Sequence, residues 1–307
     1  MVLLALLVAA AVVVAIVVMS GDDSSSNKSA TIQTGASPVA LVVAAGSVWV
    51  ADVDTGALAR INAATKKVQG TPAQVGEEPR HVAYGEGSLW TSDGTGDRIA
   101  RVDARTGRRT GRRVVGNEPS GIAVGGGSVW LADKSDDYVR RIDPRTTKAV
   151  GRPIKVGLGP EGVAYGAGAV WVANSGSSTV SRIDPQSNRV VATIRVGSAP
   201  SVIAVGEGGV WVVNSSSQTL VRIDPATNRV AGEPVRIGGI PTGLAIGEGA
   251  VWVTNDTDRE LLRIDPNNGK VTARTDVRHR PSAVAVGEGA AWVALGFSHG
   301  TVRRIEL

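Results

Sequence analysis

Histidine is the scarcest side chain in this sequence that can exchange a proton near neutral pH. Only His81, His279 and His299 occur, and the 307 residues contain no cysteine. A cysteine nucleophile, a thiolate zinc site and a disulfide scaffold are therefore excluded. Any general base or imidazole metal ligand must come from these three histidines. We expect no metal centre and no cofactor.

The residue that follows each of seven regularly spaced prolines is a candidate ligand contact. These residues are Val39, Arg80, Ser120, Glu161, Ser201, Thr242 and Ser282. Most are small, but Arg80 and Glu161 are charged, and His81 follows Arg80. Such groups can hold an anionic or amide-bearing ligand, although solvated loop side chains are the simpler alternative. We predict a ligand-binding mouth formed by Arg80, His81, Glu161, Ser120, Ser201, Thr242 and Ser282.

A second candidate site is a short segment with five arginines, and the formal net charge of the chain is +5. The five are Arg105, Arg108, Arg109, Arg112 and Arg113. Such a patch would bind an anionic polymer with an affinity that falls steeply with salt, and a solvated strand edge is the alternative. Nucleic acid is an unexpected partner because the few aromatic residues are needed for the core. An anionic envelope polymer is the favoured partner for this patch.

An internal repeat must position these residues. Tryptophans recur at Trp49, Trp90, Trp130, Trp171, Trp211, Trp252 and Trp292, at intervals of alternately 41 and 40 residues. Each is preceded 11 residues earlier by a proline: Pro38, Pro79, Pro119, Pro160, Pro200, Pro241 and Pro281. Each copy reads as four short strands, the first two apolar and the last two increasingly polar. Seven copies of four strands predict an all-β, seven-bladed propeller that forms a monomeric ring.

The two ends of the chain predict how this ring closes. Residues 30–35 (ATIQTG) match residues 192–197 (ATIRVG), which lie at the end of a repeat. The chain therefore opens with a fourth strand, and it ends after a third strand at Leu307. We expect the first segment to complete the last blade and so to remove an open sheet edge.

The repeated polar residues have structural interpretations. One tryptophan per blade among aliphatic residues is typical of the core between blades. The Asp or Asn three positions after most tryptophans, such as Asp52, is expected to bond turn backbone. Arg182 and Asp184 represent a repeated pair that should interact across one strand face.

Three segments are similar to repeats of a known propeller family: VWVAN (170–174), VSRIDP (180–185) and PSVIAVG (200–206). They resemble the YVTN-type bacterial β-propeller repeats, neighbours of the NHL repeats and of the streptogramin lyases. The resemblance covers residues 29–307. It implies a propeller fold, and the family includes binding modules, sensors and a few enzymes.

The lyase resemblance implies a His shortly after a Pro, a Glu three positions after a Trp, and a magnesium ion. In this chain no residue directly after these prolines is His, and no position three after a Trp is Glu. His81 lies one place further along, and Asp93 is the nearest carboxylate in its repeat. The enzyme alternative is therefore a hydrolase or lyase that uses His81, Glu161 and Asp93 around a divalent ion. The leading hypothesis is instead a binding or sensing module that catalyses no reaction of its own.

Residues 2–19 are an unbroken apolar run, which is long enough to span a bilayer as a helix. We predict a transmembrane anchor at 1–19, a flexible Ser- and Asp-rich linker at 20–28, and the propeller at 29–307. A secretory signal that is cleaved is the alternative. The expected protein is a single-pass membrane protein whose extracytoplasmic propeller binds an unidentified protein or small ligand at its mouth. It resembles the outer sensor of bacterial receptor Ser/Thr kinases.

Overall fold

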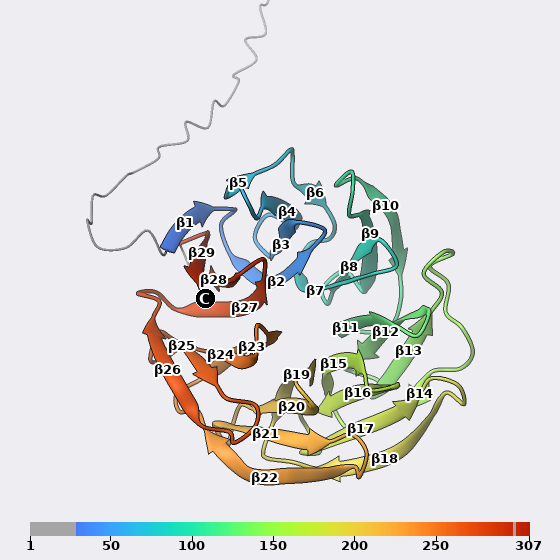
Figure 1. Ribbon diagram of the computed structural model, residues 1–307. Coiled ribbons are helices and arrows are strands. Elements are labelled where there is room, and N and C mark those ends of the chain that lie inside the picture. The colour runs from blue at the N-terminus through green and yellow to red at the C-terminus, as the bar shows by residue number, and fades with distance from the viewer. Residues whose placement is uncertain (1–28, 297–298) are drawn as a thin grey trace, which may run out of the picture.

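The computed structural model describes residues 29–296 and 299–307. Within these residues the strands form seven sheets arranged around a central axis (Figure 1). Each sheet is antiparallel, with its first strand at the axis and its fourth strand at the outside. The prediction of an all-β, seven-bladed propeller is confirmed.

Seven strands that begin at the repeated prolines surround the axis. They are β2 (Pro38–Ala44), β7 (Pro79–Gly85), β11 (Pro119–Gly125), β15 (Pro160–Gly166), β19 (Pro200–Gly206), β23 (Pro241–Gly247) and β27 (Pro281–Gly287). The second strands carry the tryptophans and are buried along their whole length. They are β3 (Ser47–Asp52), β8 (Ser88–Asp93), β12 (Ser128–Asp133), β16 (Ala169–Asn174), β20 (Gly209–Asn214), β24 (Ala250–Asn255) and β28 (Ala290–Leu295).

The third strands are mostly buried or half-buried, and the fourth strands are mostly exposed. The third strands are β4 (Ala57–Asn62), β9 (Arg98–Asp103), β13 (Tyr138–Ile142), β17 (Thr179–Asp184), β21 (Thr219–Asp224), β25 (Glu260–Ile264) and β29 (Thr301–Glu306). The fourth are β5 (Lys67–Val68) with β6 (Ala73–Gln74), β10 (Arg109–Val114), β14 (Ile154–Lys155), β18 (Arg189–Arg195), β22 (Arg229–Arg236), β26 (Val271–Asp276) and β1 (Ser29–Gln33).

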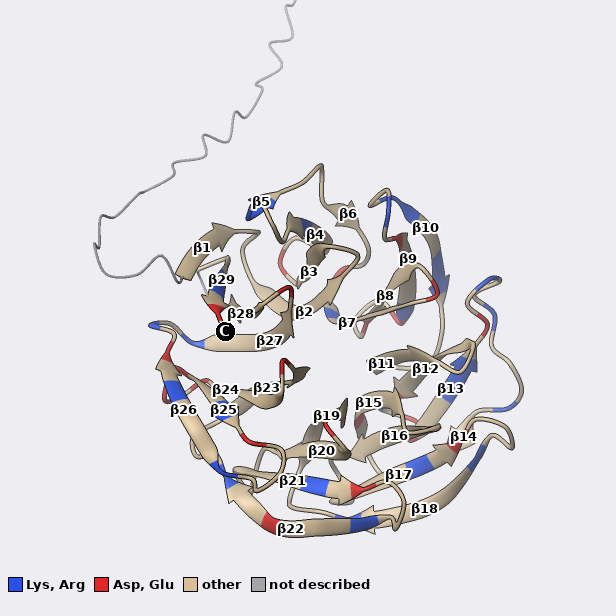
Figure 2. Cartoon of the chain, viewed as in Figure 1, with Lys and Arg blue, Asp and Glu red and all other residues tan. Residues whose placement is uncertain are grey.

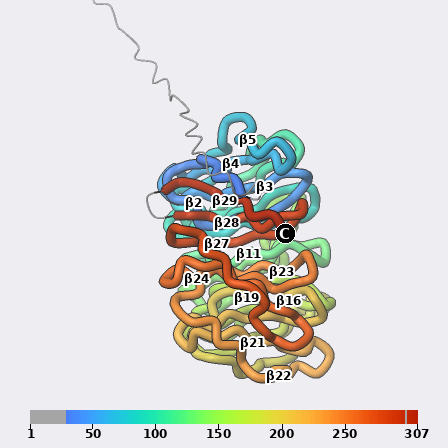
Figure 3. Tube along the Cα trace, turned by 60° about the vertical axis from the view of Figure 1, so that its left-hand side comes forward, coloured from blue at the N-terminus to red at the C-terminus, as the bar shows by residue number. Residues whose placement is uncertain are grey.

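The first strand of the described chain closes the ring. β1 pairs antiparallel with β29, with Thr31 opposite Arg303 and Ile32 opposite Val302. The first and last described strands therefore lie side by side in one blade (Figure 1), and Figure 3 shows β29 beside β28 at this edge of the ring. The buried side chain of Ile32 packs with Trp292 and Val302, so closure adds apolar contact to the backbone pairing. The predicted closure is confirmed.

The tryptophans fill the core between blades, as predicted. Each is at most 4% exposed, and an arginine of the adjacent third strand covers its ring. The Arg182 guanidinium carbon, for example, lies 5.2 Å from the centre of the Trp171 ring, which is a cation–π distance. The expected pairing of Arg182 with Asp184 is wrong. Asp184 instead accepts hydrogen bonds from the turn residues Gln186 and Ser187.

The alternating repeat length has a structural cause in the fourth strand. The longer repeats contain Gly-x-Pro at residues 70–72, 151–153 and 232–234. Gly70, Gly151 and Gly232 have φ values of 65°, 73° and 76°, a region that glycine adopts without steric cost. The motif lies between β5 and β6 in blade one and directly before the two-residue β14 in blade three, where the missing N–H of proline removes a ladder bond. In blade five β22 runs across it with a shift in pairing register.

Residues 29–296 and 299–307 contain no helix long and apolar enough to cross a membrane. The predicted anchor at 1–19 and linker at 20–28 lie outside the described residues.

Candidate functional site

The mouth of the ring is formed where the loop between blades meets the loop between second and third strands. Buried Asp52 joins these two loops in the first blade. One carboxylate oxygen accepts bonds from the N–H groups of Ala36 and Ser37, each at 2.8 Å, and the other accepts from Thr55. Asp93 does the same with Glu77, Glu78 and Gly96. These carboxylates hold the rim in one conformation, beyond the turn contacts expected from sequence.

Each inner strand has a bulge at its mouth end. The pairing register with the second strand shifts just after the proline in all seven blades, for example between Pro79 and His81 and between Pro160 and Gly162. A bulge re-aims the side chain of the extra residue. The residue after each proline is therefore placed where blades meet around the axis.

The hydroxyl residues at this position connect neighbouring blades. Ser120, Thr242 and Ser282 donate to the carbonyl oxygens of the prolines that begin the next inner strands, at 2.8, 2.8 and 2.6 Å. Ser201 bonds the Ser215 hydroxyl at 2.5 Å. The four predicted hydroxyls thus lie at the mouth as expected, but the ring itself uses their hydrogen bonds.

The charged residues of the mouth gather on blades two to four. Arg80 donates to Glu78 at 2.8 Å, and its side chain is 59% exposed. Lys134, which follows the end of β12, lies 3.6 Å from Glu161. Both carboxylates and both cations are partly exposed. The structure therefore brings Arg80, His81 and Glu161 to one sector of the mouth and adds Lys134.

His81 occupies a position where most other blades have glycine or alanine. A side chain at the equivalent Gly121 or Gly162 would collide with the backbone of the next inner strand, so this position faces the junction between blades. The imidazole of His81 makes no hydrogen bond to any residue in 29–296 or 299–307. Burial, followed by the positive charges of Arg80 and Lys134, lowers the pKa of His81 to about 4. At neutral pH its imidazole is therefore uncharged, with one donor and one acceptor nitrogen.

The other two histidines lie together on blade seven. The rings of His279 and His299 are 3.8 Å apart between centroids and tilted by 34°. Burial, His299 and nearby arginines lower the pKa of His279. Because neither ring belongs to the sector around Arg80, these histidines do not contribute to the predicted mouth site.

The donor set of the enzyme alternative is not assembled. Asp93 is 1% exposed and binds loop N–H groups with both oxygens, while Glu161 pairs with Lys134. In the described part of the chain, no three His, Asp or Glu side chains are grouped so that they could hold a metal ion.

The five predicted arginines lie on the hairpin of β9 and β10, at the outside of blade two (Figure 2). Arg109 donates to the carbonyl of Gln74 in blade one at 2.7 Å. None of the five forms an ion pair with a described residue. The patch is thus a positive surface on the outer edge of blade two, whereas the predicted mouth residues lie on the inner strands.

Lys134 is the residue that sequence reasoning missed. It stands four positions after Trp130, where the other repeats have Val53, Gly94, Ser175, Ser215, Asp256 and Gly296. Comparison of this column would have identified two charged departures, Lys134 and Asp256. The latter pairs with Arg280, which precedes the proline of blade seven.

Comparison with known proteins gives the fold and little more. The family model "Domain of unknown function (DUF5074)" matches residues 110–243, which is under half of the chain. No curated protein matches by sequence. Among solved structures, virginiamycin B lyase from Staphylococcus aureus is 17% identical, with a TM-score of 0.79 over 91% of this chain and 99% of that one.

Other structural neighbours differ in their named roles. Hydrazine synthase from Kuenenia stuttgartiensis is 18% identical, with a TM-score of 0.76 over 94% of this chain and 99% of that one. The U3-55K structure is 10% identical, with a TM-score of 0.77 over 91% and 98%. At these identities the likeness establishes a seven-bladed propeller related in shape to virginiamycin B lyase, and the activity has to be argued from this chain's own residues.

Proposed function

We propose that the chain is a membrane-tethered, extracytoplasmic β-propeller that binds a ligand or partner protein at its mouth. The observation that carries the proposal is His81. A half-buried imidazole that is uncharged and unbonded to described residues stands beside two cations, Arg80 and Lys134. The position belongs to a column of small residues, so the histidine is a local departure from what the fold requires.

The chemistry of this sector favours a ligand with a carboxylate and an amide. Arg80 and Lys134 are each paired with a partly exposed glutamate. Such exposed ion pairs contribute about 0 to 1 kcal/mol, so an incoming carboxylate can replace either glutamate at little cost. The neutral imidazole of His81 can bond an adjacent amide with its donor or its acceptor nitrogen. A peptide-like group with a free carboxylate meets both requirements.

The test uses acetylated dipeptides with a free C-terminal carboxylate and the same dipeptides as amides. NMR of the His81 ring and the thermal midpoint report on binding. We expect the carboxylate forms to shift the His81 resonances and raise the midpoint, and Arg80→Ala or Lys134→Ala to remove both effects. Arg113→Ala, on the outer strand of blade two, is the matched charge control. If no carboxylate form moves His81, or the control weakens binding equally, the mouth is not this binding site.

Tethering by residues 2–19 would hold the ring at the membrane surface, as in an outer sensor. The full chain should remain with membranes after alkaline carbonate washing, and a variant lacking residues 2–19 should be released. Protease added to intact cells should reach the propeller. If the protein expressed from the full sequence is instead soluble and has lost the mass of its N-terminal segment, a signal has been cleaved. No observation on the described residues favours the lyase alternative, because both oxygens of Asp93 accept hydrogen bonds from loop N–H groups and Glu161 pairs with Lys134.

A further inference from the structure

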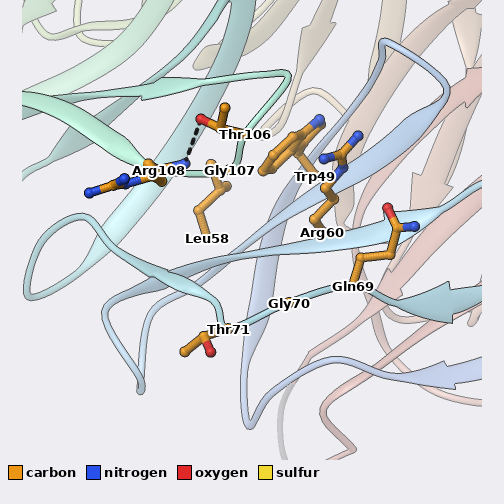
Figure 4. A pocket seen from close by; sticks show the side chains of 9 residues that line it. All are labelled: Trp49, Leu58, Arg60, Gln69, Gly70, Thr71, Thr106, Gly107 and Arg108. Atoms are coloured by element: carbon orange, nitrogen blue, oxygen red, sulfur yellow. Dashed lines mark hydrogen bonds between the residues drawn. The ribbon is translucent and has the colours of Figure 1, made fainter.

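A cleft of about 470 Å³ lies between blades one and two, and Figure 4 shows the side chains that line it. Trp49 and Leu58 form its floor, and both side chains are 1% exposed. One wall is the Gln69–Thr71 stretch between β5 and β6, and the other is the turn at residues 106–108 between β9 and β10. Trp49 and Leu58 therefore expose almost no area to a ligand, so a ligand would be held mainly by the polar walls.

The walls of the cleft carry polar side chains, and two of them have no hydrogen-bond partner among the described residues. The side chains of Gln69 and Thr71 make no hydrogen bond to described residues. Arg60 lies over Trp49 and donates to Ser47 and to the carbonyl of Arg105. In Figure 4 the Arg108 side chain extends outward from the rim, away from Trp49. An amide, a hydroxyl and a guanidinium edge thus line the cleft, and positive charge continues outside it.

The chain contains a second cleft of the same construction, which serves as an internal comparison. It lies between blades five and six, has a volume of about 170 Å³, and is lined by Trp211, Arg222 and Glu233 among others. Its walls are the Gly-x-Pro stretch of blade five and the turn between the third and fourth strands of blade six, which correspond to the two walls of the first cleft. However, Ala231 and Glu233 stand where the first cleft has Gln69 and Thr71. Both clefts keep the tryptophan and the arginine of the repeat, whereas the amide of Gln69 and the hydroxyl of Thr71 are particular to the first cleft.

The surroundings of the first cleft are strongly basic. Arg105 and Arg108 lie in the turn before β10, Arg109, Arg112 and Arg113 lie on β10, and Arg108 itself lines the cleft. Figure 2 shows this positive charge along β10, and Asp103 is the single acidic residue between positions 103 and 113. Hydrogen bonds from Thr106 lower the pKa of Asp103. The carboxylate therefore stays ionised, and it accepts these bonds within the turn. All five arginines are exposed, so a polymer that carries repeated negative charge would be attracted to this hairpin.

We propose that this cleft binds one sugar unit of an acidic glycan whose neighbouring units run along the β10 arginines. Hydroxyl-rich rings suit the Gln69 amide and the Thr71 hydroxyl, and carboxylates suit the arginines. Nucleic acid fits less well, because base stacking needs exposed aromatic faces and Trp49 is buried under Arg60. This site is separate from the mouth and does not depend on the function proposed there.

The test measures binding of oligogalacturonate to the propeller by calorimetry, with neutral dextran, oligo-dT and polyglutamate as comparisons. We expect oligogalacturonate to bind, with an affinity that falls steeply with salt. The double variant Gln69→Ala/Thr71→Glu should bind about tenfold more weakly or worse. Because it installs the residues of the second cleft, the ring is known to accommodate them at an equivalent position. Arg112→Ser/Arg113→Ser should weaken binding and reduce its salt dependence.

The matched control is Ala231→Gln/Glu233→Thr in the second cleft, which should leave oligogalacturonate binding unchanged. Three results would overturn the proposal. The first is equal binding by the Gln69→Ala/Thr71→Glu variant, which would leave the arginines alone responsible. The second is equally tight binding of oligo-dT or polyglutamate, which would indicate recognition of charge without sugar. The third is the absence of oligogalacturonate binding.

Discussion

Acidification should destabilise the propeller through His81 by an amount that the mouth geometry predicts. The pKa of this imidazole falls from 6.5 to about 4 on folding, because burial and the charges of Arg80 and Lys134 disfavour the protonated form. The unfolded chain therefore binds a proton between these pH values that the folded ring does not. Above pH 6.5 the imidazole is neutral in both states and has no effect on the free energy of unfolding, which then falls as the pH drops from 6.5 toward 4.

The magnitude follows from the size of the shift. A difference of about 2.5 pKa units, at 1.36 kcal/mol each, corresponds to about 3 kcal/mol. Since His81 is only partly buried by solvent accessibility, screening should reduce the observed effect to about 2 kcal/mol. The variant His81→Gln keeps a polar side chain of similar size and removes the titration.

The assay is urea unfolding of the wild type and His81→Gln between pH 7.5 and 4, together with NMR titration of the three histidines. Subtracting the variant removes the contribution of His279, whose pKa is also lowered. The wild type should lose about 2 kcal/mol relative to His81→Gln across this range. A His81 pKa near 6.5, or a difference between the two proteins that does not change with pH, would refute the assigned environment.

The remaining predictions concern the ring itself. Gly125→Ala should lower the free energy of unfolding by about 2 kcal/mol or more, because its new carbon would lie 2.0 Å from the Tyr165 ring. Gly127→Ala, with a φ of 70° but nothing within 4 Å, should cost only about 1 kcal/mol, so equal losses in urea unfolding would contradict the packing of blade three against blade four. Asp52→Ala should cost about 3 kcal/mol or more, since it leaves several rim N–H groups without an acceptor. Hydrogen exchange at Ala36 and Ser37 should rise in that variant, and unchanged protection would show that Asp52 does not hold the rim.

The architecture could be predicted because the same pattern of proline and tryptophan occurs in all seven repeats. One tryptophan per blade fixes the second strand, and the proline before it fixes the start of the inner strand. The likeness of residues 30–35 to 192–197 identifies the closing strand without any long-range information. Periodicity of this kind reports on local packing, which is the same in every blade.

The mouth could be predicted only in part, because its chemistry depends on contacts between blades. The bulge after each proline turns Ser120 toward the carbonyl of Pro160, and no pattern within one repeat reveals that acceptor. Lys134 reaches Glu161 from another blade, so the pair is invisible in a single repeat. The unequal clefts arise in the same way, from Gly-x-Pro in one blade and a turn in the next.

Every position assigned to the mouth depends on β1 completing the seventh blade, and an engineered disulfide tests this most directly. The chain has no cysteine, so Thr31→Cys/Arg303→Cys introduces a single possible bridge between residues that face each other in β1 and β29. We predict rapid formation of an intramolecular disulfide in the native protein, with a gain of about 5 kcal/mol expected from closing so long a loop in the chain-entropy model. Thiols that stay free on oxidation, or that link one molecule to another, would contradict the closed ring.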